Sequence, residues 1–170
     1  CLKYQRRKHL TMNNSKIIFD IEADGLNPNN VWCIVAKELN GTSHTFDNTQ
    51  IEEGIKFLQE ADTLIGHNII GYDIPVLEKL YGAEFNCKIE DTLVMSRLFN
   101  PVRENGHSLK AWGWRVGCLK QEQPEDFDSY TPEMLEYCIQ DVKLNEAVYN
   151  YLIKEGRIFS KECIDLEHRV

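Results

Sequence analysis

A short apolar run, Ile17-Ile18-Phe19, leads directly into two carboxylates, Asp20 and Glu22. The run predicts a buried strand, and side chains two residues apart on a strand lie on the same face. The two carboxylates should therefore point together at the end of a core strand. Like charges so close are costly when partly buried, and a cation held between them removes that cost. Taken alone the pair is weak evidence, because the chain has 27 acidic residues.

A second group of polar side chains follows the apolar run 63–66. The segment from Asn68 to Asp73 brings a carboxamide, the phenol of Tyr72 and a carboxylate within six residues. A helix is predicted from Ile74 to about Tyr81, with a proline tolerated in its first turn. Capping of that helix is the structural alternative for Asp73.

Tyr137 and Asp141 lie four residues apart in a long helix predicted from Thr131 to about Glu155. This spacing puts both side chains on one face of the helix. The alternative is a solvated helix face with an aromatic ring packed on the core. Together with the two earlier groups, however, the pair supplies carboxylates from three separate elements. Such convergence is what phosphodiester cleavage by two metal ions about 3.5 to 4 Å apart requires.

The remaining pattern predicts an α/β fold. Strands come first along the chain, and later strands alternate with helices, which indicates a mixed sheet flanked by helices. Further strands are expected at 31–36, 44–46 and 63–66, and further helices after Asn48, from Asp91 to Arg97 and from Ser108 to Val116. The stretch 121–130 is expected to be a surface loop.

The charge and the cysteines restrict the possible partners. The net charge is −8, which argues against a protein that holds duplex DNA by massed positive charge. No apolar run is long enough to span a membrane and no signal peptide is evident, so a cytoplasmic protein is expected. The six cysteines are scattered without a C-x-x-C pair, which favours reduced thiols over disulfides.

The motifs resemble those of the DEDD exonucleases, which have a ribonuclease-H-like fold. The matching patterns are D-x-E at Asp20 and Glu22, N-x-x-x-[FY]-D from Asn68 to Asp73, and Y-x-x-x-D from Tyr137 to Asp141. The chain is most similar to the proofreading domain of family A DNA polymerases, particularly those of short-tailed phages. The segments that carry this similarity are 20–26, 67–75, 91–98, 111–115 and 140–142.

This resemblance implies an organisation in three parts. Residues 1–15 would be an N-terminal extension, 16–158 the 3′-to-5′ exonuclease domain, and 159–170 the start of a connection to a polymerase domain. The basic cluster within 1–11 is either sequence upstream of a natural start at Met12 or an arm that contacts DNA. The resemblance also implies a monomer that acts in the host cytoplasm if a phage encodes it.

The resemblance further implies a metal site for two divalent ions, Mg²⁺ with Mn²⁺ as a substitute. Asp20, Glu22 and Asp141 would bind the ion that carries the attacking water. Asp20 would bridge to the second ion, and Asp73 would hold that ion through water.

The same resemblance assigns roles toward a single-stranded or frayed DNA 3′ end. Tyr137 would orient the attacking water, Leu26 would wedge against the terminal bases, and Asn68 would touch the terminal nucleotide. Trp112 and Trp114 are expected in the core rather than stacked on bases.

Other residues and other functions stay open on the sequence. Asp91 is interpreted either as a carboxylate that supports the site from behind or as a simple helix cap. A free-standing DEDD ribonuclease that trims RNA ends is the first alternative function. A catalytically silent module that binds DNA or braces a neighbouring domain is the second.

Overall fold

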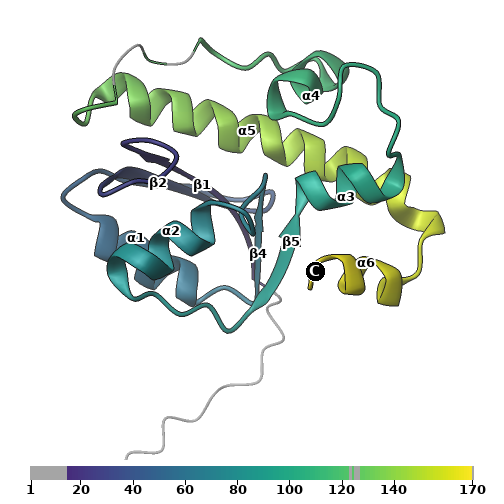
Figure 1. The fold of residues 1–170 in the computed structure, drawn as a ribbon, viewed down its shortest axis with the longest axis horizontal. Coiled ribbons are helices and arrows are strands. Elements are labelled where there is room, and N and C mark those ends of the chain that lie inside the picture. Colours follow the sequence, from purple (N-terminus) through teal and green to yellow (C-terminus); the bar gives the residue numbers. More distant parts are fainter. Residues whose placement is uncertain (1–14, 123, 125–126, 170) are drawn as a thin grey trace, which may run out of the picture.

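One five-stranded sheet forms the centre of the molecule in the computed structural model, which describes residues 15–122, 124 and 127–169 (Figure 1). The strands are β1 (Lys16–Ala23), β2 (Val31–Glu38), β3 (Ser43–Phe46), β4 (Thr63–Gly66) and β5 (Lys88–Asp91), in the spatial order β3-β2-β1-β4-β5. β1 pairs antiparallel with β2 and parallel with β4. The predicted mixed sheet is confirmed.

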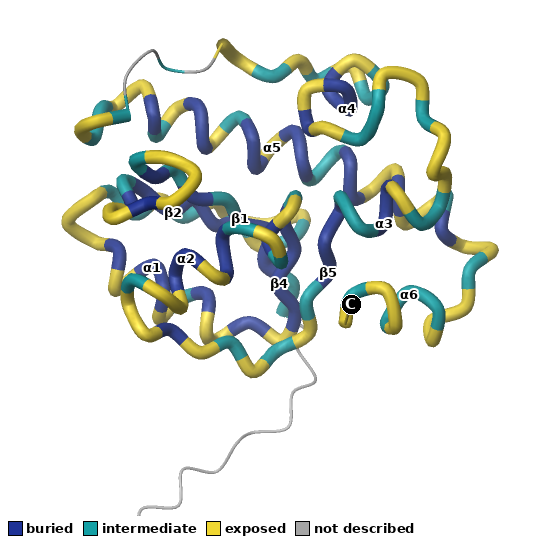
Figure 2. Tube along the Cα trace, in the orientation of Figure 1, coloured by how far each residue is buried: buried dark blue, intermediate teal, exposed yellow. Residues whose placement is uncertain are grey.

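Helices cover both faces of this sheet, as Figure 1 shows. The helices of the chain are α1 (Ile51–Gln59), α2 (Asp73–Tyr81), α3 (Thr92–Phe99), α4 (Leu109–Val116), α5 (Pro132–Glu155) and α6 (Lys161–Glu167), with a short 3-10 turn at Gly156–Ile158. α1 and α2 pack on one face through one apolar cluster, and α3, α4 and α5 pack on the other through a second cluster. Figure 2 shows the sheet buried between these layers.

β1 contributes to both apolar clusters because its side chains alternate. Ile17, Phe19 and Ile21 pack with α1 and α2, whereas Ile18 packs with residues of α5. The strand is therefore buried on both faces, and every second residue after Ile18 is directed toward the α5 side.

Three predicted helix starts are confirmed by hydrogen bonds. The Asp91 carboxylate accepts from the backbone N–H of Leu93 at 2.9 Å. The Ser108 hydroxyl accepts from Ala111 at 3.2 Å, and the Thr131 hydroxyl accepts from Met134 at 3.3 Å. Thr131 thus starts α5, the long helix that crosses the sheet, and fixes where its side chains fall.

One expectation from the sequence is wrong, and one strand was not predicted. Trp112 is fully buried as expected, but Trp114 is 72% exposed, because the two residues point to different sides of α4. The strand β5 was not expected, since its sequence Lys-Ile-Glu-Asp is charged and short. It forms because parallel pairing with the buried β4 supplies its backbone partners.

Other expectations agree with the structure or lie outside the described residues. The described cysteines, which exclude Cys1, are all free thiols. Within 121–130, the residues that the structure describes form no helix or strand. The basic cluster of 1–11 lies outside the described part of the chain. Across the described residues, no helix is both long and apolar enough to cross a membrane.

Candidate active site

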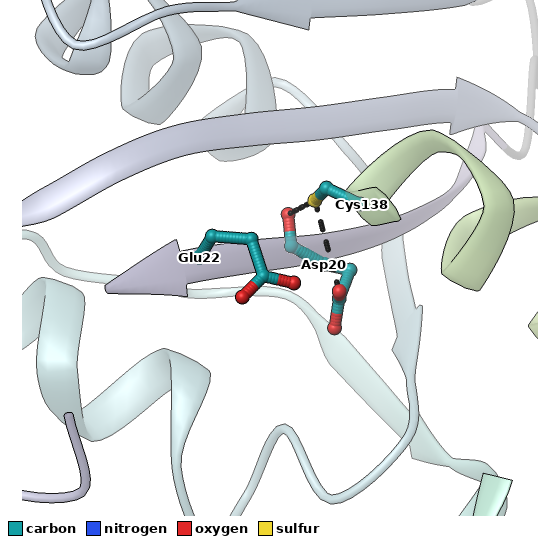
Figure 3. Close-up of side chains that lie close together, drawn as sticks. All are labelled: Asp20, Glu22 and Cys138. Carbon is teal, nitrogen blue, oxygen red and sulfur yellow. Dashed lines mark hydrogen bonds between the residues drawn. The ribbon is translucent and has the colours of Figure 1, made fainter. Parts of the chain in front are cut away.

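Asp20 and Glu22 lie together on the α5 side of β1. The strand alternation described above directs both carboxylates there, and Figure 3 shows them beside Cys138 of α5. One oxygen of each carboxylate and the sulfur of Cys138 all lie within 4.8 Å of one another. The Cys138 thiol donates to the carbonyl oxygen of Asp20, with a sulfur to oxygen distance of 3.4 Å.

Asp141 joins this cluster from α5, one helical turn after Tyr137. Its side chain is buried, and the two oxygens differ in their surroundings. Oδ2 accepts from the Lys120 ammonium at 2.5 Å. Oδ1 is buried and has no hydrogen-bond partner in the described part of the chain.

Asp73 reaches the site from the first turn of α2. It does not cap that helix, because the N-cap residue is Tyr72 and no side chain caps there. Instead its Oδ1 accepts from the backbone N–H of Ile21 at 3.2 Å, beyond the part of β1 that pairs with β4. The structure therefore brings together the four carboxylates that the sequence singled out, from β1, α2 and α5.

The pKa of each of the four carboxyl groups is raised. Burial is the main cause for each of them. Burial, then Asp73, Glu22 and Asp141, hold the pKa of Asp20 well above its usual range. Burial and the charge of Asp141 raise the pKa of Glu22 to about 8, and burial raises the pKa of Asp73 to about 7. The cluster is therefore costly to ionise unless a cation joins it.

The residues of this cluster suit a hard divalent cation. They offer carboxylate oxygens, which Mg²⁺ and Mn²⁺ prefer, and the Oδ1 atom of Asp141 lacks a partner. Burial also holds the pKa of Cys138 well above its usual range, so the thiol keeps its proton at neutral pH. A protonated thiol does not bind metal, which leaves the carboxylates as the ligands.

Lys120 is a site residue that the sequence analysis missed. It lies in the irregular segment after α4, and besides its bond to Asp141 its ammonium sits 4.7 Å from the ring centroid of Tyr137. Burial alone would lower the pKa of Lys120, but the charge and the hydrogen bond of Asp141, together with Tyr137, outweigh burial and raise it. No sequence pattern marks a lone lysine of this kind.

Tyr137 lies on the same face of α5 as Asp141, as the spacing predicted. Burial raises its pKa above the usual value of 10.0, so the phenol is neutral at neutral pH. The hydroxyl can therefore donate or accept one hydrogen bond without carrying charge.

Leu26 and Asn68, the expected contacts to the nucleotide, lie on loops at this end of the sheet. Leu26 is 96% exposed after β1. Asn68 adopts a left-handed backbone with φ of 67°, and its N–H donates to Asp91 Oδ1 at 2.9 Å. Asp91 also accepts from Ile70, so it caps α3 and braces the loop before Asp73 at the same time. Both interpretations of Asp91 thus apply to one side chain.

The comparison with known sequences leads to phage polymerases. No family model matches the chain. The chain is 26% identical over 164 residues to the DNA-directed DNA polymerase of Escherichia phage T7, an alignment that covers 62% of this chain and 23% of the polymerase. The polymerase of Enterobacteria phage T3 gives the same values. The chain thus spans less than a quarter of the length of these relatives.

The comparison with solved structures leads to nucleases of one fold. Brucella melitensis NrnC superimposes with a TM-score of 0.71 at 19% identity, covering 91% of this chain and 80% of NrnC. Escherichia coli RNase D gives a TM-score of 0.66 at 16% identity, covering 91% of this chain and 44% of RNase D. At these identities the likeness establishes the fold.

The sheet order and the flanking helices are those of the ribonuclease-H-like fold that NrnC and RNase D share. In sequence, the chain is related to the DNA polymerases of phages T7 and T3.

Proposed function

We propose that the chain is the 3′-to-5′ proofreading exonuclease domain of a DNA polymerase. It would hydrolyse the terminal phosphodiester of single-stranded or frayed DNA. The observation that carries the proposal is the convergence of Asp20, Glu22, Asp73 and Asp141 from three elements, with their pKa values raised mainly by burial. Two buried and two half-buried carboxylates in one cluster weaken a fold unless they hold cations, so their presence indicates a metal-dependent site.

In this proposal Asp20, Glu22 and Asp141 would hold one Mg²⁺, and Asp20 with Asp73 would hold a second. When bound, these ions would supply an activated water and neutralise charge on the phosphate. The chain contributes the geometry. β1 fixes the two carboxylates of the D-x-E pair, and α5 presents the unpartnered Oδ1 of Asp141. The bond from Ile21 N–H holds Asp73 in place.

Tyr137 would position the attacking water through its hydroxyl. A phenol whose pKa lies above 10.0 is protonated at neutral pH, so it is a poor general base. It can still hold a water in line with the phosphorus by one hydrogen bond. Its place one turn before Asp141 puts it beside a proposed metal ligand.

A single-stranded substrate suits the charge of the chain. With a net charge of −8, binding must depend on a few local contacts and on the metal ions rather than on a long positive surface. A site that reads a few terminal nucleotides requires separated strands. The exposed Leu26 is suited to wedge between terminal bases, and Asn68 lies on the loop that leads to Asp73.

A free-standing nuclease acting on RNA or short oligonucleotides is the second candidate. It is supported by the superposition on NrnC, which covers 91% of this chain, and by the structure of NrnC bound to pGG. The sequence similarity to the T7 and T3 polymerases favours the proofreading function over this candidate.

Cleavage of 5′-labelled single-stranded DNA tests the proposal. The protein is incubated with Mg²⁺ or with chelator, beside RNA of the same sequence and blunt duplex DNA. We expect a ladder shortened from the 3′ end in Mg²⁺, with single-stranded DNA preferred over duplex and over RNA. Asp20→Ala should abolish the ladder, and Glu53→Gln on the exposed face of α1 is the matched control.

Three results would contradict the proposal. Preferred degradation of RNA would favour the second candidate. Failure of the wild-type protein to bind Mn²⁺ or to cleave would indicate a silent module. More than about a tenth of wild-type turnover in Asp20→Ala would remove Asp20 from the metal site.

A further inference from the structure

We infer that Lys120 is a positioning residue of this active site, which holds Asp141 and Tyr137 in the arrangement that cleavage needs and moderates the attraction of the four carboxylates for metal. The inference rests on the proposed function for its effect on cleavage. Its effect on metal binding does not depend on the substrate.

One ammonium group contacts two neighbouring side chains of α5. Lys120 Nζ donates to Asp141 Oδ2 at 2.5 Å and lies 4.7 Å from the centroid of the Tyr137 ring. The second contact is a cation-π interaction at a distance where it is attractive. Since Tyr137 and Asp141 are one turn apart, Lys120 fixes the rotamers of both relative to each other.

The backbone around Lys120 is held on both sides. Gly113 of α4 packs against it so closely that a Cβ at position 113 would stand 2.9 Å from the carbonyl oxygen of Cys118 and 3.3 Å from the nitrogen of Lys120. From α5, Gln140 Nε2 donates to the carbonyl oxygen of Leu119 at 3.0 Å. Lys120 is therefore a fixed part of the site and not a mobile surface lysine.

The bond to Asp141 also determines which oxygen stays free. Oδ2 is occupied by Lys120, whereas Oδ1 is buried without a partner. A lysine that binds one oxygen of a carboxylate thus leaves the other available as a metal ligand. At the same time its positive charge, partly buried beside the carboxylates, repels a divalent cation.

These two effects predict opposite changes when Lys120 is replaced. Loss of the charge removes the repulsion, so metal binding should become tighter. Loss of the two contacts frees Asp141 and Tyr137 to rotate, so cleavage should become slower. A residue with a merely structural role would weaken both properties or change neither.

The test compares Lys120→Met with Lys120→Arg, which keeps the charge, and with Lys143→Met, a matched control on the exposed side of α5. Metal affinity is measured by Mn²⁺ titration with water-proton relaxation, and cleavage by single-turnover assays in saturating Mg²⁺. For Lys120→Met we expect at least about threefold tighter Mn²⁺ binding and at least about tenfold slower cleavage. Lys120→Arg should keep both the Mn²⁺ affinity and the cleavage rate close to those of wild type, and Lys143→Met should match wild type.

Gly113→Ala is a second variant that keeps the lysine but displaces its backbone. It should slow cleavage in the same way, and circular dichroism verifies that each variant is folded. Cleavage by Lys120→Met within about twofold of wild type would overturn the inference, as would weaker Mn²⁺ binding by that variant. If the wild-type protein cleaves nothing, the proposed function fails, and the Mn²⁺ titration still decides the role of Lys120.

Discussion

Asp73 Oδ1 accepts a hydrogen bond of 3.2 Å from the backbone N–H of Ile21, the residue between the two carboxylates of β1. One side chain thus joins the start of α2 to the strand that carries Asp20 and Glu22. The bond has two consequences. It satisfies a backbone donor that the pairing with β4 no longer reaches, and it holds a third carboxylate against the other two.

Replacing Asp73 should separate its hydrogen bond from its charge. Asp73→Asn keeps an acceptor for Ile21 N–H and removes a buried charge, so the metal-free protein at pH 8 should gain about 1 to 3 kcal/mol of stability. Asp73→Ala loses the acceptor and should be about 1 to 2 kcal/mol less stable than Asp73→Asn. Urea unfolding in chelator measures both. Equal stability of the two variants would show that the bond to Ile21 contributes nothing.

The pKa of Glu22 predicts how the metal-free protein responds to pH. Burial and the charge of Asp141 raise that pKa from 4.5 to about 8 in the folded state. The folded protein therefore binds this proton more tightly than the unfolded chain does. The resulting stability is fully present below about pH 4.5 and is lost as the pH rises through about 8. Saturating Mn²⁺ should reverse the loss.

Glu22→Gln should remove this part of the pH dependence. The difference between wild type and variant is the quantity to measure, because burial lowers the pKa of His67 to about 4, and this shift acts with the opposite sign below pH 6.5. Thermal unfolding in chelator should show that the variant becomes more stable relative to wild type as the pH rises above 5. Glu53→Gln is the exposed control. If the difference in melting temperature between Glu22→Gln and wild type does not change with pH, the pKa of Glu22 is not raised in the folded protein.

The sequence was sufficient for features that depend on local periodicity. The alternation along β1 predicted that Asp20 and Glu22 lie on the same face of that strand. The four-residue spacing predicted that Tyr137 and Asp141 lie on the same face of α5. Asp91, Ser108 and Thr131 begin helices through short side chains that bond backbone N–H groups nearby. These features require no knowledge of the rest of the fold.

Features that depend on contacts between distant segments could not be predicted in this way. Lys120 belongs to the site only because α4 and α5 hold an irregular segment between them. Cys138 was expected only to be a reduced thiol, and the packing of α5 on β1 brings it to Asp20. For Trp114, hydrophobicity indicated burial, but the packing of α4 through Trp112 decided which of the two faces the core.

Tyr137→Phe should lower single-turnover cleavage by about tenfold to a thousandfold while metal affinity stays nearly unchanged, because only the hydroxyl is removed. Asp141→Asn should damage both properties, since Asp141 is a proposed metal ligand. Cleavage assays and Mn²⁺ titration of the two variants provide the comparison. Unaltered cleavage by Tyr137→Phe would exclude the tyrosine from the mechanism.

His168 connects α6 to the loop that precedes Asp73. Its Nδ1 donates to the carbonyl oxygen of Ile164 at 2.7 Å, which leaves Nε2 as the acceptor for the backbone N–H of Asp91 at 2.8 Å. The carboxylate of Asp91 in turn accepts from Asn68 and Ile70. A side chain near the end of the described chain therefore supports the loop on which the proposed nucleotide contact lies.

His168→Ala should loosen this connection. The partly buried N–H of Asp91 loses its acceptor, at a cost of about 1 to 3 kcal/mol. Amide hydrogen exchange of Asn68 and Ile70 should become faster, because the carboxylate that binds them is less firmly held. KM for single-stranded DNA should rise more than kcat falls, since the change affects a binding loop and leaves the four carboxylates in place. Arg169→Ala, an exposed neighbour, is the control. If exchange at Asn68 and Ile70 is the same in His168→Ala and in that control, α6 does not support the active-site loop.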